Sequence, residues 1–380
     1  MKAKKWLRLF FILMIVFFVG VGGIVIYLDP FFHYHVPLSS WSYELSDQRS
    51  QNDGITRHFE YDAIITGTSM AENFLTSEFD SLFGTDSVKL PYPGATFKEI
   101  NDNLEVAFET HDEIRIVLRP LDYSHITEDK DAMRMDMGEY PEYLYDDNPF
   151  NDVEYLYNWD VVAYYILPML EAKLKGEEGS ITSFDDYSSS AEDECSKEAA
   201  LTGISGFGVA DEQEQLTEEE VIQIEENMEQ NVIALARQHP ETTFICFFPP
   251  YSAVWWGCLK EDGTLIKQIE AEEIAARMML EETDNIRVYS FNLHDELIFD
   301  LDNYKDAGHY GAHVNSWILS WIEEGEGELT LENLDEYIAE ETQLYLEYDY
   351  TQLLTEQQEE GTGDSQAADV LEGIHNEAVE

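Results

Sequence analysis

Apolar and polar positions along the chain predict short buried strands separated by amphipathic helices. Five apolar runs of strand length lie at residues 62–66, 87–92, 113–123, 242–248 and 286–291. Apolar positions at helical spacing lie between and after them, at residues 70–84, 97–109, 217–239, 267–282 and 312–323. Strands that alternate with helices are joined by right-handed parallel crossovers. The pattern therefore predicts an α/β protein, a three-layer α/β/α sandwich with a parallel sheet.

An N-terminal segment departs from this pattern, because residues 9–28 form an apolar stretch without a charge. About 20 apolar residues are what a helix needs to cross the hydrocarbon core of a bilayer. The stretch is followed by Asp29 and preceded by four basic residues: Lys2, Lys4, Lys5 and Arg8. The positive-inside rule then places the N-terminus in the cytoplasm and the main domain outside it. A cleaved signal peptide is the alternative, but its apolar region is usually shorter and no small-residue cleavage site is evident. We expect an uncleaved, single-pass anchor in the cell membrane.

The same pattern divides the rest of the chain. We predict a basic stub at residues 1–8, the anchor at 9–28, an irregular aromatic lead-in at 29–57, the α/β domain at 58–323 and an acidic extension at 324–380. The domain carries a Tyr- and Asp-rich insertion at about 124–215, with one helix near Trp159–Lys175. Thr217 and Glu220 form a capping box at the start of the following helix. The extension contains one amphipathic helix, at 331–348, and a tail that we predict to be disordered.

Charge excludes one class of partner. The chain has 79 acidic and 21 basic residues and a formal net charge of -58, whereas binding to nucleic acid needs a basic footprint for the phosphates. Its three cysteines are too few and too scattered for a disulfide framework or a zinc site. Cys246 lies in an apolar run and is predicted to be a buried thiol, with a Cys246–Cys258 bridge as the alternative in an oxidising compartment. No metal or cofactor is expected.

Ser69 is the first candidate for chemistry. It follows the strand at 62–66 and precedes the predicted helix at 70–84, and ligands bind at the carboxyl edge of open parallel sheets. The alternative is that Thr68 or Ser69 only caps the helix. Far downstream, Asp306 and His309 are spaced i, i+3, which places both side chains on one face if that turn is helical. They match the base and the orienting acid that a serine nucleophile needs. The alternative is that Asp306 caps the last helix and His309 is an ordinary surface residue.

Taken together, these segments resemble the SGNH/GDSL hydrolase superfamily. Ser69 stands in GTSM after the first strand, Gly94 in LPYPGATFKE after the second, and Asp306 and His309 in DAGH before the last helix. YDAIITGTSMAENF and NYKDAGHY are also similar to membrane-anchored SGNH-like proteins of Gram-positive bacteria. A more distant similarity is to extracytoplasmic proteins that serve O-acetylation of polysaccharides or D-alanylation of teichoic acids. The resemblance implies a flavodoxin-like sheet over residues 58–323, a Ser69–His309–Asp306 triad, and an oxyanion hole built from the backbone N–H groups of Ser69 and Gly94.

The chain departs from the superfamily pattern in two places. Gly-Asp-Ser is Gly67-Thr68-Ser69 here, which keeps the nucleophile. The third block of the superfamily offers an Asn as an oxyanion donor, whereas Arg119–Tyr123 contains no Asn. Arg119 is the candidate to replace it if its side chain points inward. Removing one such donor typically costs ~10²–10³ in rate.

Aromatic residues follow the strand at 242–248 on the expected ligand side of the sheet. They are Tyr251, Trp255 and Trp256. Their faces could stack on sugar rings, and packing in the core or in a lid is the alternative.

The expected function is that of an extracytoplasmic serine esterase or O-acyltransferase acting on acyl esters of a cell-envelope glycan or polymer. Water as the acceptor gives an esterase and a sugar hydroxyl gives a transferase, and the sequence leaves both open. The expected partners are the polymer, the membrane around the N-terminal helix and, for transfer, a membrane-bound acyl-transfer protein. The alternative is a non-catalytic SGNH-like envelope module that binds a polymer or a membrane partner, which the missing Asn of the third block motivates.

Overall fold

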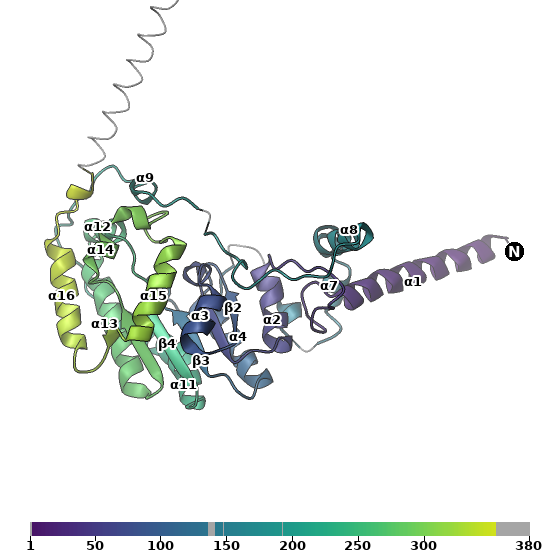
Figure 1. Ribbon diagram of the computed structural model, residues 1–380, viewed down its shortest axis with the longest axis horizontal. Coiled ribbons are helices and arrows are strands. Elements are labelled where there is room, and N and C mark those ends of the chain that lie inside the picture. The colour runs from purple at the N-terminus through teal and green to yellow at the C-terminus, as the bar shows by residue number, and fades with distance from the viewer. Residues whose placement is uncertain (1, 136–140, 147, 192, 355–380) are drawn as a thin grey trace, which may run out of the picture. The chain divides into compact units, whose positions relative to one another are not determined.

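A computed structural model describes residues 2–135, 141–146, 148–191 and 193–354 and shows an α/β protein with a six-stranded, mostly parallel sheet (Figure 1). The strands are β1 (Ala63–Gly67), β2 (Ser87–Pro91), β3 (Ile116–Pro120), β4 (Thr243–Phe248), β5 (Ile286–Ser290) and β6 (Glu328–Leu329). Their order is β2-β1-β3-β4-β5-β6. β1 is parallel to β2 and β3, and β6 is antiparallel to β5. The α/β class and the five predicted strands are confirmed, in the 2-1-3-4-5 order of a doubly wound sheet.

The chain forms two compact units, each assembled from three segments. Unit 1 comprises Met1–Pro120, Glu128–Ser190 and Glu229–Cys246, and unit 2 comprises Leu121–Thr127, Ala191–Met228 and Phe247–Glu380. The predicted insertion at about 124–215 is therefore divided between both units. The tail from residue 355, predicted to be disordered, lies outside the described residues.

Unit 1 contains β1, β2 and β3 together with the N-terminal helix. Its helices are α1 (Lys2–Leu28), α2 (Gln48–His58), α3 (Thr76–Phe83), α4 (Phe97–Thr110), α6 (Glu142–Tyr145), α7 (Val153–Leu156), α8 (Leu167–Lys175) and α11 (Ala234–Gln238), with the 3₁₀ turn η1 (Ser69–Ala71) and the π-helical turns η2 (Val161–Ile166) and η3 (Glu229–Ile233). The predicted helix at 97–109 is confirmed as α4. The helix expected near Trp159–Lys175 is confirmed as η2 followed by α8.

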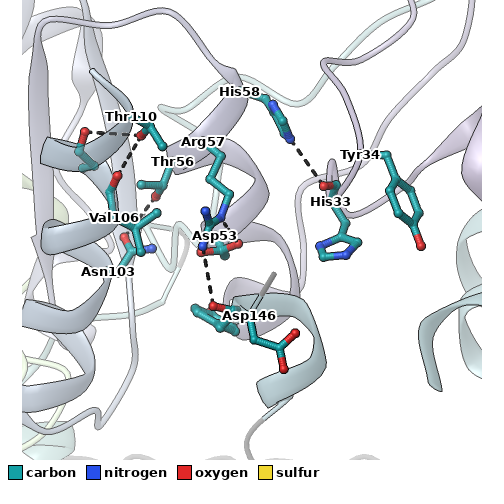
Figure 2. A network of polar contacts seen from close by, with 12 residues as sticks. His33, Tyr34, Asp53, Thr56, Arg57, His58, Asn103, Val106, Thr110 and Asp146 are labelled. Atoms are coloured by element: carbon teal, nitrogen blue, oxygen red, sulfur yellow. Dashed lines mark hydrogen bonds and ion pairs between the residues drawn. The ribbon is translucent and has the colours of Figure 1, made fainter. Parts of the chain in front are cut away.

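Helix α2 lies in the lead-in that the sequence pattern predicts to be irregular, and that prediction is wrong. Its buried residues are Gln51, Asn52, Asp53, Gly54, Ile55 and Thr56. The buried face is thus mostly polar, so no apolar period marks the helix. Figure 2 shows two of the contacts that satisfy it: Arg57 Nε donates to Asp53 Oδ2 at 2.7 Å, and Thr56 Oγ1 donates to Asn103 Oδ1 of α4 at 3.0 Å.

Unit 2 contains β5, β6 and the C-terminal helices. The helices are α5 (Tyr123–Ile126), α9 (Lys197–Ala200), α10 (Glu218–Met228), α12 (Ala253–Asp262), α13 (Leu265–Glu282), α14 (Asp295–Ile298), α15 (Ala312–Glu324) and α16 (Leu334–Glu347), with the 3₁₀ turn η4 (Leu301–Asn303). The predicted helices at 267–282, 312–323 and 331–348 are confirmed as α13, α15 and α16. The predicted capping box is also confirmed, since the Thr217 N–H donates to Glu220 Oε2 at 3.0 Å and the Glu220 N–H to Thr217 Oγ1 at 3.3 Å.

Helix α16 is joined to the rest of unit 2 by a buried pair of glutamates, Glu272 of α13 and Glu341 of α16. Tyr123 Oη and Ser290 Oγ donate to Glu272 at 3.0 and 3.1 Å, and Asn292 Nδ2 donates to Glu341 Oε1 at 2.7 Å. Burial raises the pKa of Glu272 to about 7, and burial together with the neighbouring Glu272 charge raises the pKa of Glu341 well above its ordinary value. The pair therefore keeps a proton at neutral pH, because two adjacent buried carboxylates resist ionising together.

Helix α1 is long and apolar enough over Ala3–Leu28 to cross a membrane, a property that a signal sequence shares. Residues from Trp6 to Val19 are exposed, whereas Gly22, Val25 and Leu28 are buried in unit 1. The last turns of the helix are thus part of the packing of the unit.

Cys246 is buried, as predicted, and burial raises the pKa of its thiol to about 12. All three cysteines are free, so the alternative Cys246–Cys258 bridge is not formed.

Candidate active site

Asp306 and His309 form a hydrogen-bonded pair in unit 2. His309 Nδ1 lies 2.8 Å from Asp306 Oδ2 and 3.1 Å from Oδ1. The same carboxylate accepts hydrogen bonds from the backbone N–H groups of Gly308 and His309, both at 2.8 Å. A carboxylate in this position holds the imidazole with Nδ1–H toward Asp306, so Nε2 is the nitrogen that can exchange a proton with a nucleophile.

The pair lies in a tight loop rather than at a helix start. The Lys305 N–H donates to the His309 carbonyl at 2.8 Å, and Tyr304 and Tyr310 form an antiparallel bridge across the loop. Helix α15 begins only at Ala312. The spacing of Asp306 and His309 therefore brings them together through the closure of this loop, without any helical turn.

Ser252 fastens the loop to the first turn of α12. Its backbone N–H and its hydroxyl both donate to the Ala307 carbonyl, at 3.2 and 2.7 Å. The Ser252 hydroxyl also caps α12 by accepting from the Val254 N–H at 3.2 Å. Because Ser252 is fully buried, water does not compete for these bonds, and the position of the loop is fixed by the helix.

The electrostatics of the pair favour an ionised Asp306 and a basic His309. Burial raises the pKa of Asp306, but its hydrogen bonds from His309 and Gly308 outweigh that effect and lower the pKa to about 2. The hydrogen bond to Asp306 raises the pKa of His309 above its ordinary value of 6.5, burial opposes the shift, and the charge of Asp122 adds to it. His309 is therefore a stronger base than a free imidazole.

Asp122 is a second carboxylate at this site, which the sequence did not single out. It is buried, lies two residues after the end of β3, and accepts a hydrogen bond from the Tyr251 hydroxyl. The Tyr251 ring covers the loop, since a Cβ at Gly308 would lie 3.8 Å from it. An acidic residue just after a strand, at the edge of the sheet where ligands bind, is the signal that could have identified Asp122.

The three aromatic residues predicted to contact a substrate have different environments. Tyr251 and Trp255 are half-buried, and their rings meet edge to face at 4.9 Å. Trp255 also stacks on Tyr123 at 5.0 Å. Trp256 is fully buried and stacks on Tyr345 of α16 at 4.2 Å. Trp256 is therefore a core residue with no face for a substrate, whereas stacking by Tyr251 and Trp255 stays a prediction.

Ser69 opens the 3₁₀ turn η1 directly after β1 in unit 1. Thr68 is the cap of this turn, because its Oγ1 accepts a hydrogen bond from the Met70 N–H at 3.3 Å. The predicted helix at 70–84 is shorter than expected, since α3 begins only at Thr76. A three-residue turn has little dipole, so no long helix begins at Ser69 to stabilise an oxyanion.

Gly94 adopts a φ of 63° in the turn after β2, a conformation that favours glycine. The Arg134 guanidinium packs on it, because a Cβ at Gly94 would lie 1.8 Å from Arg134 Nη1. That nitrogen donates to the Pro93 carbonyl at 2.6 Å. Arg134 thus places a positive charge beside the predicted oxyanion donor. It lies in the predicted insertion, where no motif marks it.

Arg119 is buried at the end of β3. Its Nη1 donates to the Asn231 carbonyl at 2.7 Å and its Nη2 to the Phe97 carbonyl at 3.2 Å. Burial lowers its pKa to about 10. Among the described residues, Arg119 Nε has no hydrogen-bond partner. Its role as an oxyanion donor stays a prediction.

The predicted site residues are distributed over the two units. Unit 1 contains Ser69, Gly94 and Arg119, and unit 2 contains Asp306, His309 and the aromatic residues. Within unit 2 the structure brings the Asp306–His309 loop together with Tyr251 and Asp122. In the described part of the chain, no group of three or more His, Cys, Asp or Glu side chains is placed to hold a metal ion.

Comparisons with family models, with curated proteins and with solved structures found no match to this chain.

Proposed function

We propose that this protein is an SGNH-type serine esterase or O-acyltransferase that acts on acyl esters of a cell-envelope glycan or polymer and is held at the membrane by α1. The observation that carries the proposal is the Asp306–His309 pair, in which a carboxylate of lowered pKa binds Nδ1 at 2.8 Å. That arrangement leaves Nε2 as the basic nitrogen, which is what a serine nucleophile requires.

The reaction proceeds in two halves. Ser69 Oγ attacks the acyl carbonyl while His309 takes the serine proton, and the histidine then gives this proton to the departing alkoxide. The acyl-enzyme is resolved when His309 removes a proton from water or from a sugar hydroxyl, which attacks the acyl carbon and releases Ser69. Asp306 stabilises the imidazolium that forms in both halves. The two acceptors give an esterase or a transferase with the same residues.

The topology of the sheet supports the assignment of Ser69 to this chemistry. Ser69 follows β1 after one intervening residue, Thr68, and Asp306 and His309 lie in the connection from β5 to α15. In a parallel sheet these connections leave the strands at the carboxyl edge, where ligands bind. The proposal requires Ser69 to reach His309 in the working protein, which the labelling experiment below tests.

Charge stabilisation in the transition state falls to the backbone N–H groups of Ser69 and Gly94, helped by the positive charge of Arg134 beside Gly94. Tyr251 and Trp255, half-buried beside the catalytic loop, supply aromatic faces that suit sugar rings. A glycan or a polyol polymer is therefore the substrate class that we propose.

The test is labelling of the full-length protein by a fluorophosphonate, together with turnover of a short-chain aryl ester. We expect wild type to be labelled, and Ser69→Ala and His309→Gln to lose labelling and at least ~10³-fold of turnover. Ser81→Ala, an exposed serine of unit 1, is the matched control and keeps both. If wild type and Ser69→Ala behave alike, the catalytic proposal fails.

One observation favours a second candidate, a non-catalytic module that binds an envelope polymer. Arg119 is buried with both Nη groups bonded to backbone carbonyls, and the third block offers no amide side chain to an oxyanion. This candidate expects no turnover by wild type and full binding of the polymer by Ser69→Ala, which a pull-down with purified cell-wall polymer measures.

A further inference from the structure

A segment of unit 1 packs against α1 at Phe18 and Gly22, several residues before the helix ends at Leu28. The Tyr157 hydroxyl donates to the Phe18 carbonyl at 3.3 Å, and the two rings meet edge to face at 5.5 Å. Gly22 permits this approach, since a Cβ there would lie 3.1 Å from Tyr157 Oη. Figure 1 shows α7 beside the end of α1, and α7 and η2 both contact it. We call residues 150–175 the flanking segment.

The level of this contact constrains the position of a membrane. Phe18 lies ten residues before Leu28, which is about 15 Å along a helix axis. The hydrocarbon core is only about 30 Å thick. Val25 and Leu28 are packed in unit 1, so the part of α1 that lipid can cover ends before them, and a bilayer that covers the exposed residues as far as Val19 reaches the level of Tyr157. If α1 spans a membrane, the flanking segment cannot lie entirely in the water above it.

The side chains that the flanking segment exposes fit such a position. Phe150, Trp159, Tyr164 and Leu174 are 86%, 72%, 70% and 88% exposed. Exposed apolar area of this extent is unfavourable in water at about 25 cal/mol per Å². Tryptophan and tyrosine are the residues enriched where the acyl chains meet the headgroups.

A second group of residues lies at the end of α1 and has the same character. The rings of Tyr27 and Trp41 meet edge to face at 6.3 Å, and Lys173 Nζ lies 5.4 Å from the centre of the Trp41 ring. Aromatic rings with a lysine beside them are typical of the membrane–water boundary. Glu154 and Asp160 are exposed on the flanking segment and limit its depth to the headgroup level.

We propose that the flanking segment is a second membrane-contacting surface, in which Phe150, Trp159, Tyr164 and Leu174 enter the boundary between headgroups and acyl chains in the leaflet that contains the C-terminal half of α1. Its partner is the lipid bilayer around the helix. The inference rests on the membrane anchor in the proposed function and is independent of the serine chemistry. Insertion of about 5–10 Å is typical of interfacial segments, and it keeps unit 1 in contact with the membrane surface.

The test is the depth of nitroxide labels in the full-length protein, reconstituted in lipid nanodiscs with its three cysteines replaced by alanine. Labels are placed at Trp159→Cys and Leu174→Cys, with Val19→Cys on α1 as the lipid reference and Glu113→Cys, exposed in unit 1, as the water reference. We expect the ratio of oxygen to nickel-chelate accessibility at positions 159 and 174 to be several-fold higher than at 113 and to approach that at 19.

Two results would overturn the inference, and each has its own meaning. A water-like ratio at 159 and 174 with a lipid-like ratio at 19 means that α1 is inserted and the flanking segment is not. A water-like ratio at 19 means that α1 is not a membrane span, and the flanking segment then has no bilayer to enter. Fluorophosphonate labelling of Ser69 in the same samples reports the proposed catalysis separately from either depth result.

Discussion

At the scale of single residues, the Asp306–His309 pair fixes the ionisation of the site. Asp306 raises the pKa of His309, so the imidazole keeps its proton to a higher pH than a free one. Asp306→Asn removes that charge, and we expect the pKa of His309 to fall. Turnover should then begin to rise at a lower pH while its plateau drops by about 10⁴-fold, the scale of the same change in a serine-protease triad. NMR titration of labelled histidine and the pH dependence of kcat/KM measure the two effects; an unchanged His309 pKa would contradict the pairing.

Asp122 also raises the pKa of His309 through its charge, and its carboxylate accepts a hydrogen bond from Tyr251. We expect Asp122→Asn to lower the pKa of His309 by less than Asp306→Asn does. The plateau of turnover should stay within about 10-fold of wild type, since the imidazole is still oriented by Asp306. The same titration and kinetics check this, and a loss as large as that of Asp306→Asn would make Asp122 the orienting acid instead.

Gly94 and Gly84 provide a matched pair of substitutions. Both have a positive φ, 63° and 66°, so alanine at either position costs about 1–2 kcal/mol in backbone strain. Only at Gly94 does the new Cβ meet a neighbour, the Arg134 guanidinium, whereas a Cβ at Gly84 meets nothing within 4 Å. We expect Gly94→Ala to reduce fluorophosphonate labelling by about 10²-fold and Gly84→Ala to leave it unchanged. Equal labelling of both variants would remove Gly94 from the site.

At the scale of elements, the docking of α16 depends on the protonation of the buried pair Glu272 and Glu341. The raised pKa of Glu272, about 7 against an ordinary 4.5, means that stability is complete below about pH 4.5 and falls as the pH rises through 7. The loss amounts to about 3 kcal/mol above pH 8, as an order of magnitude. Glu341→Gln removes the cost of keeping this buried carboxyl protonated at high pH, and its new amide can donate to Asn292 Oδ1, which has no partner among the described residues.

We therefore expect Glu341→Gln to hold α16 more firmly than wild type at pH 8.5 and about equally at pH 5. Hydrogen exchange of the peptide that covers α16, corrected for intrinsic rates, measures the opening of this helix. Glu340→Gln, on the exposed face of the same helix, is the control and should behave as wild type at both pH values. Faster exchange in Glu341→Gln at pH 8.5 would show that the pair is not a source of pH-dependent strain.

Elements with an apolar face were predictable and those with a polar face were not. Strands β1 to β5 and helices α4, α13, α15 and α16 follow from apolar periodicity, because burial of that face is what folds them. Helix α2 buries Gln51 and Asn52 instead, and their side chains donate to backbone carbonyls of other segments. Such partners leave no periodic signal in the sequence.

In the candidate site, contacts between residues close in sequence were predictable, and contacts made through tertiary structure were not. The spacing of Asp306 and His309 is readable, because the pair is local in sequence. Asp122, Tyr251 and the loop meet only through tertiary structure, and Arg134 reaches Gly94 across 40 positions of the chain. Thr68, not Ser69, caps η1, and this turn ends at Ala71. Apolar spacing predicted one continuous helix over residues 70–84 and did not indicate this short turn.

At the scale of the whole molecule, the net charge of -58 makes self-repulsion a general property. Surface charges are screened over about 10 Å at 0.1 M salt and over about 30 Å at 0.01 M. We expect the melting temperature to rise by several degrees between 10 and 200 mM NaCl. Choline chloride at the same ionic strength should have the same effect, which separates screening from binding of sodium. A melting temperature that falls with salt would mean that the attractive ion pairs outweigh the repulsion.

The interleaving of the two units has a consequence for how the protein is made. The chain passes from one unit to the other after Pro120, Thr127, Ser190, Met228 and Cys246. Unit 1 thus lacks its last segment until residue 246 has been synthesised, and unit 2 needs residues beyond that point. Neither unit can finish folding while the ribosome is still adding the first half of the chain. The first half of the chain must therefore wait, without its packing partners, until the second half has been synthesised.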